Sequence, residues 1–305
     1  MKVVQSSVTK PSVIRSMVAP SASLLLPILQ PLASLLTLSR KLNAAEKLAK
    51  FCLYLSQSRA NTGLDAAWSL ALLAEVLRCQ GRFAEAEATA RQGLEMYLQC
   101  ESELAQGSPD KAEQRALSHE LLGTILRDLG RYSEALKMGK KACEMVEQIQ
   151  NSGATTSSAF VLADCYYELS RTLNYTGQPD DAITLLHQAL GLRGGAEEEP
   201  ETTKPDRYKA NILAELSRAY LMSGEFKEAQ CAADTAMSNL SVSEHAEEQL
   251  ARARVILAVA DVLKQSPDKT AEERSKATAL REEALAIRKK WLSAKDPELL
   301  DIGGG

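Results

Sequence analysis

Small and apolar residues recur at helical spacing through the middle of the chain, in blocks that repeat after nearly equal intervals. Each block contains one glycine, and successive glycines are separated by 49, 47 and 47 residues. A small residue stands seven positions before each glycine and a larger apolar or aromatic residue stands four positions before it, so both lie on one helix face. The pattern predicts a helix that ends at each of four glycines: Gly81, Gly130, Gly177 and Gly224.

A second helix is predicted after each glycine, because an alanine follows five residues later and another small residue twelve residues later. Small side chains at these positions let two helices approach closely. Glycine tolerates the left-handed backbone at a helix C-terminus, so each glycine is expected to form a tight turn between two helices. In the third block Pro179 stands at the first position of the second helix, and Asp180 and Asp181 favour the positive end of its dipole.

These blocks resemble the tetratricopeptide repeat, a helix–turn–helix unit. The four matching stretches are ALLAEVLRCQGRFAEAEATARQGL, ELLGTILRDLGRYSEALKMGKKAC, YELSRTLNYTGQPDDAITLLHQAL and AELSRAYLMSGEFKEAQCAADTAM. The resemblance implies an all-α fold, a right-handed superhelical solenoid of antiparallel helix pairs. Four units span residues 66–240, and a degenerate fifth unit in residues 244–292 keeps Ala277 and Ala284 seven positions apart. The predicted repeat domain is residues 43–298, and residues 299–305 are a predicted tail.

The period exceeds the basic tetratricopeptide period of about 34 residues by about thirteen. Residues 284–300, ALAIRKKWLSAKDPELL, are similar to the long repeats of the kinesin-light-chain branch, but the other linkers do not share the Lys-Asp-Pro ending. HEAT and armadillo repeats have periods of about 40–47 residues. The glycine turn and the alanine spacing favour the tetratricopeptide type.

Composition agrees with an all-helical chain and argues against nucleic acid as a partner. The 305 residues are 45% hydrophobic but only 5% aromatic, which favours many packed amphipathic helices over a sheet. The net charge is −4, and residues 46–305 alone sum to −9, because the first 45 residues carry five basic side chains and no acidic one. An acidic body of this kind is not expected to bind nucleic acid.

Residues 1–42 are predicted to be a flexible N-terminal segment. Their acid-free composition resembles an organelle transit peptide, which leaves two locations open, cytoplasmic and, through an N-terminal presequence, mitochondrial. The prolines of this segment are expected to interrupt any helix in it: Pro11, Pro20, Pro27 and Pro31. The apolar run Leu24–Leu38 has 15 residues, fewer than the about 20 that cross a bilayer, so no membrane span is expected.

The sequence contains no catalytic or metal-binding motif. It lacks a phosphate-binding loop, a dinucleotide-binding glycine motif and a nucleophile elbow. None of the three histidines, His119, His187 and His245, has another His or Cys four positions away. The six cysteines form no C-x-x-C pair and are expected to be reduced core residues. We therefore expect no enzyme activity, no metal and no cofactor.

The resemblance implies that residues thirteen, ten, six and three positions before each turn glycine face a concave groove. These positions hold Trp68, Ala71, Glu75, Arg78, Leu117, Glu120, Thr124, Arg127, Asp164, Tyr167, Arg171, Asn174, Asn211, Ala214, Arg218 and Leu221. Seven of them form the predicted peptide-binding site: Arg78, Arg127, Arg171, Asn174, Arg218, Asn211 and Tyr167. Guanidinium groups form paired hydrogen bonds with carboxylates, so the site is expected to take an acidic or C-terminal peptide segment of a partner protein.

Two uses of the four arginines remain open, because they can also pair with acidic residues of their own or neighbouring helices. The candidates for such pairing are Glu75, Glu120, Asp164, Glu168 and Glu215. The Lys and Asn clamp with which some tetratricopeptide co-chaperones hold a peptide C-terminus is absent, since no unit has Lys or Asn ten or six positions before its glycine.

The predicted function is that of a protein–protein interaction scaffold or adaptor. The alternatives are an organelle assembly or regulatory factor and, less favoured, RNA binding by helical repeats. Self-association is a further expectation if the last unit lacks a polar cap, because solenoids need polar capping repeats for solubility.

Overall fold

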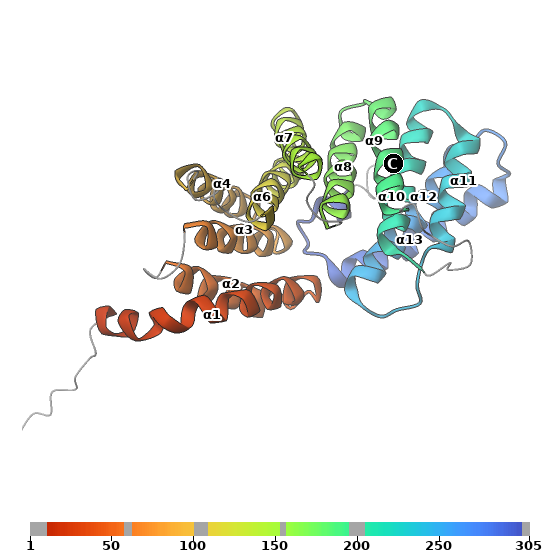
Figure 1. Cartoon of the computed structure of the whole chain (residues 1–305). Coiled ribbons are helices and arrows are strands. Elements are labelled where there is room, and N and C mark those ends of the chain that lie inside the picture. The colour runs from red at the N-terminus through yellow and green to blue at the C-terminus, as the bar shows by residue number, and fades with distance from the viewer. Residues whose placement is uncertain (1–10, 58–62, 101–108, 153–156, 195–204, 301–305) are drawn as a thin grey trace, which may run out of the picture.

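The structure, a computed structural model, describes residues 11–57, 63–100, 109–152, 157–194 and 205–300 (Figure 1). These residues form helices connected by short turns and loops, and the described part of the chain contains no strand. The helices are α1 (Pro11–Leu38), α2 (Leu42–Ser56), α3 (Gly63–Cys79), α4 (Phe83–Gln99), α6 (Pro109–Asp128), α7 (Tyr132–Asn151), α8 (Ser157–Tyr175), α9 (Pro179–Arg193), α10 (Arg207–Ser223), α11 (Phe226–Ser238), α12 (Ala246–Gln265), α13 (Ala271–Trp291) and α14 (Pro297–Leu300). The all-helical prediction is therefore confirmed.

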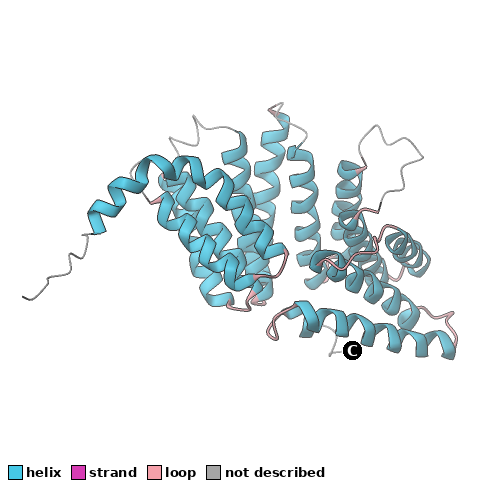
Figure 2. Cartoon of the chain, turned by 90° about the horizontal axis from the view of Figure 1, so that it is seen from below, coloured by secondary structure: helices cyan, strands magenta, loops and turns pink. Residues whose placement is uncertain are grey.

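The helices pack as consecutive antiparallel pairs. Each of α1, α3, α6, α8, α10 and α12 packs on the helix that follows it, and successive pairs stack on one another. Figures 1 and 2 show that the stack is curved, so that the pairs follow an arc from α1 to α13. A curved stack of this kind places the first helices of successive pairs side by side.

The four turn glycines adopt the left-handed conformation that the sequence predicts. Their φ angles are +74° at Gly81, +74° at Gly130, +71° at Gly177 and +78° at Gly224. At Gly81 the amide nitrogen of Arg82 donates to the Leu77 carbonyl at 2.9 Å, which satisfies a carbonyl of the last helical turn. The Gly81 amide donates to the Arg78 carbonyl, also at 2.9 Å, and the equivalent two bonds close the other three turns. Pro179 begins α9, as expected.

Small residues form the contact between the two helices of each pair. Ala74, Ser170 and Ser217, seven positions before their glycines, are fully buried. The Ser217 hydroxyl donates to the Ala229 carbonyl of the following helix at 2.8 Å. A Cβ atom added to Gly123 would lie 3.3 Å from the Ala135 carbonyl oxygen, closer than most Cβ contacts. Larger side chains at these positions would therefore separate the helices.

The degenerate fifth unit is a complete helix pair, α12 and α13. Ala277 and Ala284 are buried between the two helices. A capping box starts α13, since the Thr270 hydroxyl accepts from the Glu273 amide and the Glu273 carboxylate accepts from the Thr270 amide. The short helix α14 follows, and residues 301–305 of the predicted tail lie outside the described residues.

The N-terminal segment differs from the sequence prediction. Residues 1–42 were expected to be flexible and broken by proline, but α1 continues through Pro20, Pro27 and Pro31. Residues 1–10 lie outside the described part of the chain.

Packing accounts for the persistence of α1. Each internal proline removes a helical hydrogen bond, yet Leu26 and Ala33 are buried, and the Gln30 amide donates to the Ser69 hydroxyl of α3 at 3.2 Å. The outer face of α1 leaves Ile28 and Leu35 exposed. No helix in the described ranges is long and apolar enough to cross a membrane.

Candidate peptide-binding groove

Two adjacent cavities run along the first helices of the pairs. One of about 630 Å³ is lined mainly by α1, α3, α6 and α8, and one of about 560 Å³ by α8, α10, α12 and α13. Six residues line both: Tyr167, Arg171, Tyr175, Asn211, Arg254 and Glu298. Because the cavities share these walls, we describe them together as the groove, with a first and a second cavity.

The groove contains every position selected from the sequence except one. Asn174 lies outside both cavities and is buried, and its amide donates to the Glu215 carboxylate at 2.7 Å. It therefore joins α8 to α10 and does not face the groove, which corrects its predicted place. The remaining predicted residues are brought together along the groove walls.

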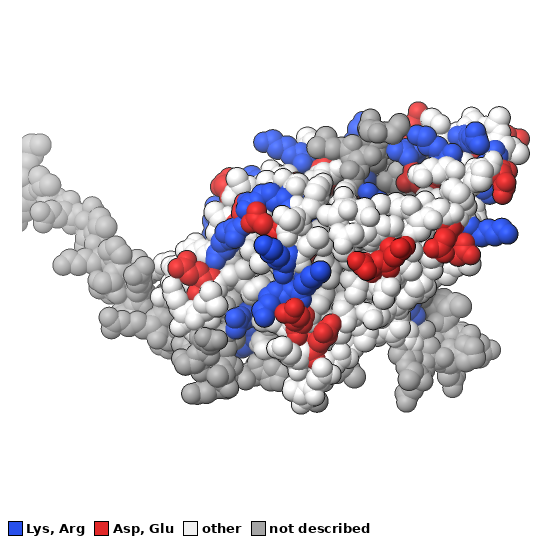
Figure 3. Space-filling view, turned by 90° about the horizontal axis from the view of Figure 1, so that it is seen from above, with Lys and Arg blue, Asp and Glu red and all other residues white. Residues whose placement is uncertain are grey.

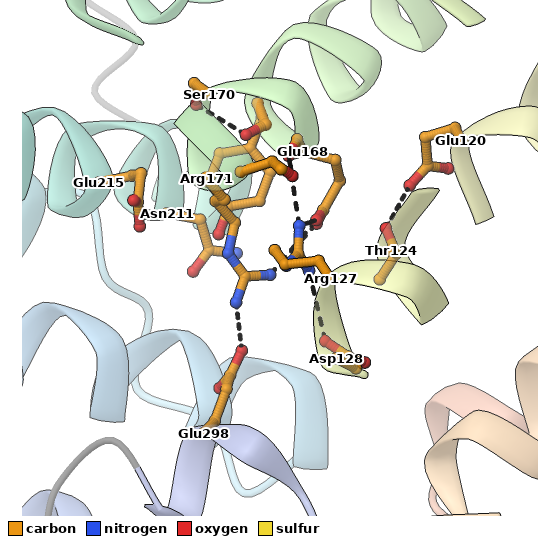
Figure 4. A network of polar contacts seen from close by, with 12 residues as sticks. Glu120, Thr124, Arg127, Asp128, Glu168, Ser170, Arg171, Asn211, Glu215 and Glu298 are labelled. Atoms are coloured by element: carbon orange, nitrogen blue, oxygen red, sulfur yellow. Dashed lines mark hydrogen bonds and ion pairs between the residues drawn. The ribbon is translucent and has the colours of Figure 1, made fainter. Parts of the chain in front are cut away.

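Arg78, Arg127 and Arg171 pair with carboxylates of the chain itself, which is the second of the two uses that the sequence leaves open. Arg78 forms two bonds with Glu75, at 2.8 and 2.9 Å. Arg127 is buried and bonds Glu168 at 2.7 Å, and Arg171 lies 3.4 Å from the same carboxylate (Figure 4). The Arg127–Glu168 pair links α6 to α8, and Arg78 also contacts Asp128 of α6 at 3.1 Å. This pairing leaves little of Arg127 for a ligand.

The fourth arginine, Arg218, lies against an aromatic ring. Its guanidinium carbon is 4.7 Å from the centre of the Tyr175 ring, and Arg171 lies 5.7 Å from the Tyr167 ring. Such stacking holds a guanidinium in place while its edge still donates hydrogen bonds. The middle of the groove thus combines aromatic rings with arginine.

The groove residues missed from the sequence include Arg254, Arg288 and Glu298. The fifth unit has no turn glycine from which positions could be counted. Ala260, a fully buried small residue of α12, could have served as the reference position instead. Counting from it as from Ala74 in the first unit leads to four residues that all line the second cavity: Arg254, Leu257, Asp261 and Lys264.

Charge changes sign along the groove. The first cavity is lined by eight acidic and five basic residues, and the second by six basic and three acidic residues. Within the first cavity, burial and the nearby carboxylates of Glu168, Glu75 and Asp164 raise the pKa of Glu120. The Thr124 hydroxyl donates to this carboxyl at 3.2 Å (Figure 4). The groove is therefore polarised, with an acidic end and a basic end.

The carboxylate of Glu298 lies where the two cavities meet. It contacts Arg171 at 2.9 Å and Arg254 at 3.2 Å through one oxygen, and Arg288 at 3.6 Å through the other. Burial opposes its ionisation, but attraction to Arg254, Arg288 and Arg171 holds the pKa of Glu298 well below its usual range. Glu298 is thus a carboxylate bound in the groove by the chain's own arginines.

The residues that the structure describes contain no cluster of metal-ligand side chains.

Sequence and structure comparisons identify the repeat type. A curved stack of antiparallel helix pairs is the architecture of helical-repeat proteins. Sequence models described as tetratricopeptide repeat match residues 67–92, 120–149 and 162–194. The chain therefore carries tetratricopeptide repeats, as its sequence predicts. No curated protein matches it by sequence.

Several solved structures share the fold at low sequence identity. BtubC (BKLC) from P. vanneervenii is 18% identical, with a TM-score of 0.54 over 76% of this chain and 91% of that one. A Rap protein complexed with Competence and Sporulation Factor is 14% identical, with a TM-score of 0.57 over 89% of this chain and 72% of that one. NprR in complex with its cognate peptide NprX is 13% identical, with a TM-score of 0.57 over 97% and 72%. The kinesin light chain repeats of Podosopora anserina have a TM-score of 0.51 at 19% identity, over 72% and 95%.

Proposed function

We propose that this protein is a scaffold or adaptor that binds an extended segment of a partner protein in the groove. The observation that carries the proposal is the polarised lining, since a cavity lined by six basic and three acidic residues attracts an acidic segment. The repeat fold supports it, because stacked helix pairs expose a continuous concave surface along their first helices. Two structures of the same fold contain a peptide or factor, by their descriptions.

The polarity of the groove also sets an orientation for the partner segment. Its acidic part lies in the second cavity, against Arg218 and Lys264, and its basic part lies in the first cavity, which has more acidic than basic lining residues. Aromatic side chains at Trp68 and Tyr167 supply apolar contact between these ends. Outside the groove, basic and acidic side chains lie beside one another, as Figure 3 shows for one face. Such a mixed surface favours a specific groove over general attraction to a polyanion.

Site-specific photocrosslinking tests the proposal in the full chain. A photoreactive phenylalanine analogue replaces Tyr167 in the groove or, as a control, Phe51, which is exposed on α2 and lines neither cavity. After irradiation in cell extract, we expect protein adducts at position 167 that are absent at position 51. Peptide mapping of the adducts should identify one acidic stretch of the partner. Equal adducts at both positions, or none at 167, would contradict the proposal.

A further inference from the structure

Three guanidinium groups from three helices surround the single carboxylate of Glu298. Arg171 comes from α8, Arg254 from α12 and Arg288 from α13, and Glu298 lies in α14. Figure 4 shows the contact between Arg171 and Glu298. The Arg288 guanidinium also donates to the main-chain oxygen of Glu298. This is the geometry of a carboxylate-binding site, because each guanidinium presents its donors toward one acceptor group.

The arginines of this site exceed the negative charge that they bind. Among the described residues, Arg254 and Arg288 form salt bridges with no carboxylate other than Glu298. The Arg288 side chain is only 7% exposed, and its Nε finds no hydrogen-bond partner among the described residues. Burial and repulsion from Arg254 and Arg171 lower the pKa of Arg288. A buried, under-bonded cation beside two others indicates room for a more strongly bound anion.

The segment Ser293–Leu300 that carries Glu298 has little other anchorage. Residues 293–299 are all partly or fully exposed, and the Glu298 amide donates to the Asp296 carboxylate of the segment itself at 3.0 Å. The segment crosses the groove, since Asp296, Pro297 and Glu298 line the first cavity, and it reaches the turn at Gly81, where an added Cβ would meet Ser293. Apolar burial therefore adds little to its binding, and the Glu298 contacts dominate.

We propose that Arg171, Arg254 and Arg288 form a carboxylate clamp for an acidic residue of a partner segment, and that Glu298 occupies this clamp as an internal competitor. The proposal names the ligand chemistry of the groove and in that respect rests on the proposed function. A partner segment binds by displacing Ser293–Leu300, and the acidic residue of the partner takes the place of Glu298. The segment and the partner are then alternatives for one site.

The test supplies the segment as a separate peptide. The full chain with Glu298→Ala is titrated with a fluorescent peptide of residues 293–300, SAKDPELL, and binding is followed by anisotropy. We expect the variant to bind at least about tenfold more tightly than the wild-type chain, since a charge-assisted bond is worth about a tenfold change or more. Arg254→Ala added to the variant should abolish this gain, and Gln in place of the peptide's Glu should weaken binding about tenfold.

Controls separate the clamp from damage to the fold. Glu144→Ala removes an exposed carboxylate of α7, outside both cavities, and should bind the peptide like the wild-type chain. Circular dichroism checks helix content, and the isosteric Glu298→Gln replaces the Ala variant if that variant is unfolded. Hydrogen exchange at residues 293–300 should be faster in the Glu298 variant than in the wild-type chain.

The outcomes are distinct. Equal binding of the peptide by the wild-type chain and the variant, no binding by either, or indifference to the Gln peptide would each overturn the clamp. This experiment needs no partner. If the peptide bound as expected but photocrosslinking failed, the proposed function would be lost, while the binding of a carboxylate by the three arginines would stand.

Discussion

Arg127 of α6 and Glu168 of α8 join two neighbouring repeats through a buried salt bridge. The Arg127 guanidinium donates to the Glu168 carboxylate at 2.7 Å and to the Glu168 main-chain oxygen at 3.2 Å. Attraction to Arg171 and Arg127 overcomes the effect of burial and holds the pKa of Glu168 below its usual range. The pair therefore fixes the first helices of two units against each other at the floor of the groove.

Replacing Arg127 by Met, which keeps the apolar stem, should leave Glu168 without one of its cations in a buried place. We expect Arg127→Met to lower the free energy of unfolding by about 2–4 kcal/mol, since breaking a buried pair leaves an uncompensated charge. Urea unfolding followed by circular dichroism measures the loss. Arg131→Met is the matched control, four residues on, because Arg131 pairs with Glu134 and Glu87 at the surface. A similar loss in both variants would show that burial of the pair is unimportant.

Glu120 should make the fold less stable as pH rises. Folding favours the protonated carboxyl, because the pKa of Glu120 is raised above its ordinary value of 4.5 in the native state. Above pH 4.5 the unfolded chain therefore releases this proton while the native chain retains it, and stability falls until the pH passes the raised pKa.

The glutamine side chain of Glu120→Gln is neutral at every pH, so this variant should lose the part of the pH dependence of stability that comes from Glu120. We expect the variant to be more stable than the wild-type chain at about pH 8, by roughly 1.4 kcal/mol for each unit by which the pKa is raised. The difference should nearly vanish at about pH 4, where the Glu120 carboxyl is mostly protonated in both the folded and the unfolded wild-type chain. Thermal unfolding of both proteins across this range measures it. If the difference in stability between the two proteins did not change with pH, the raised pKa of Glu120 would be contradicted.

The parts of the fold that follow a local rule could be predicted, and the parts that depend on distant packing could not. The turn glycines and small residues could be counted along the sequence, because each repeat forms its own helix pair. Glu298 meets Arg171 across 127 residues, a contact that no repeat offset contains. The helix α1 was missed because its prolines disfavour helix locally, while burial of Leu26 and Ala33 favours it through neighbouring helices.

Docking of α1 should depend on Leu26. This side chain is 2% exposed and packs with Cys52 and Leu55 of α2. We expect Leu26→Ala to cost about 2–4 kcal/mol of local stability and to expose α1 to protease, while the other repeats stay folded, because each unit of a repeat array contacts only its neighbours. Limited proteolysis followed by mass spectrometry measures the release of α1. Ile28→Ala, at a residue 65% exposed on the same helix, should leave the cleavage rate unchanged.

Two glycines of the third repeat should respond to alanine with opposite signs. Gly177 has a φ of +71°, and no atom lies within 4 Å of an added Cβ, so any cost of Gly177→Ala comes from the backbone alone. A left-handed alanine costs about 1–2 kcal/mol, which we expect as lost stability. Gly191 lies exposed inside α9 with a helical backbone, and it too has no atom within 4 Å of an added Cβ.

Gly191→Ala should therefore stabilise the chain by up to about 1 kcal/mol, because alanine is the better helix former. The two variants make the same chemical change, so the difference between their unfolding midpoints in urea isolates the backbone conformation. A loss at both positions would mean that the added methyl group disturbs packing in this repeat. A gain at both would mean that the turn at Gly177 does not require the left-handed conformation in solution.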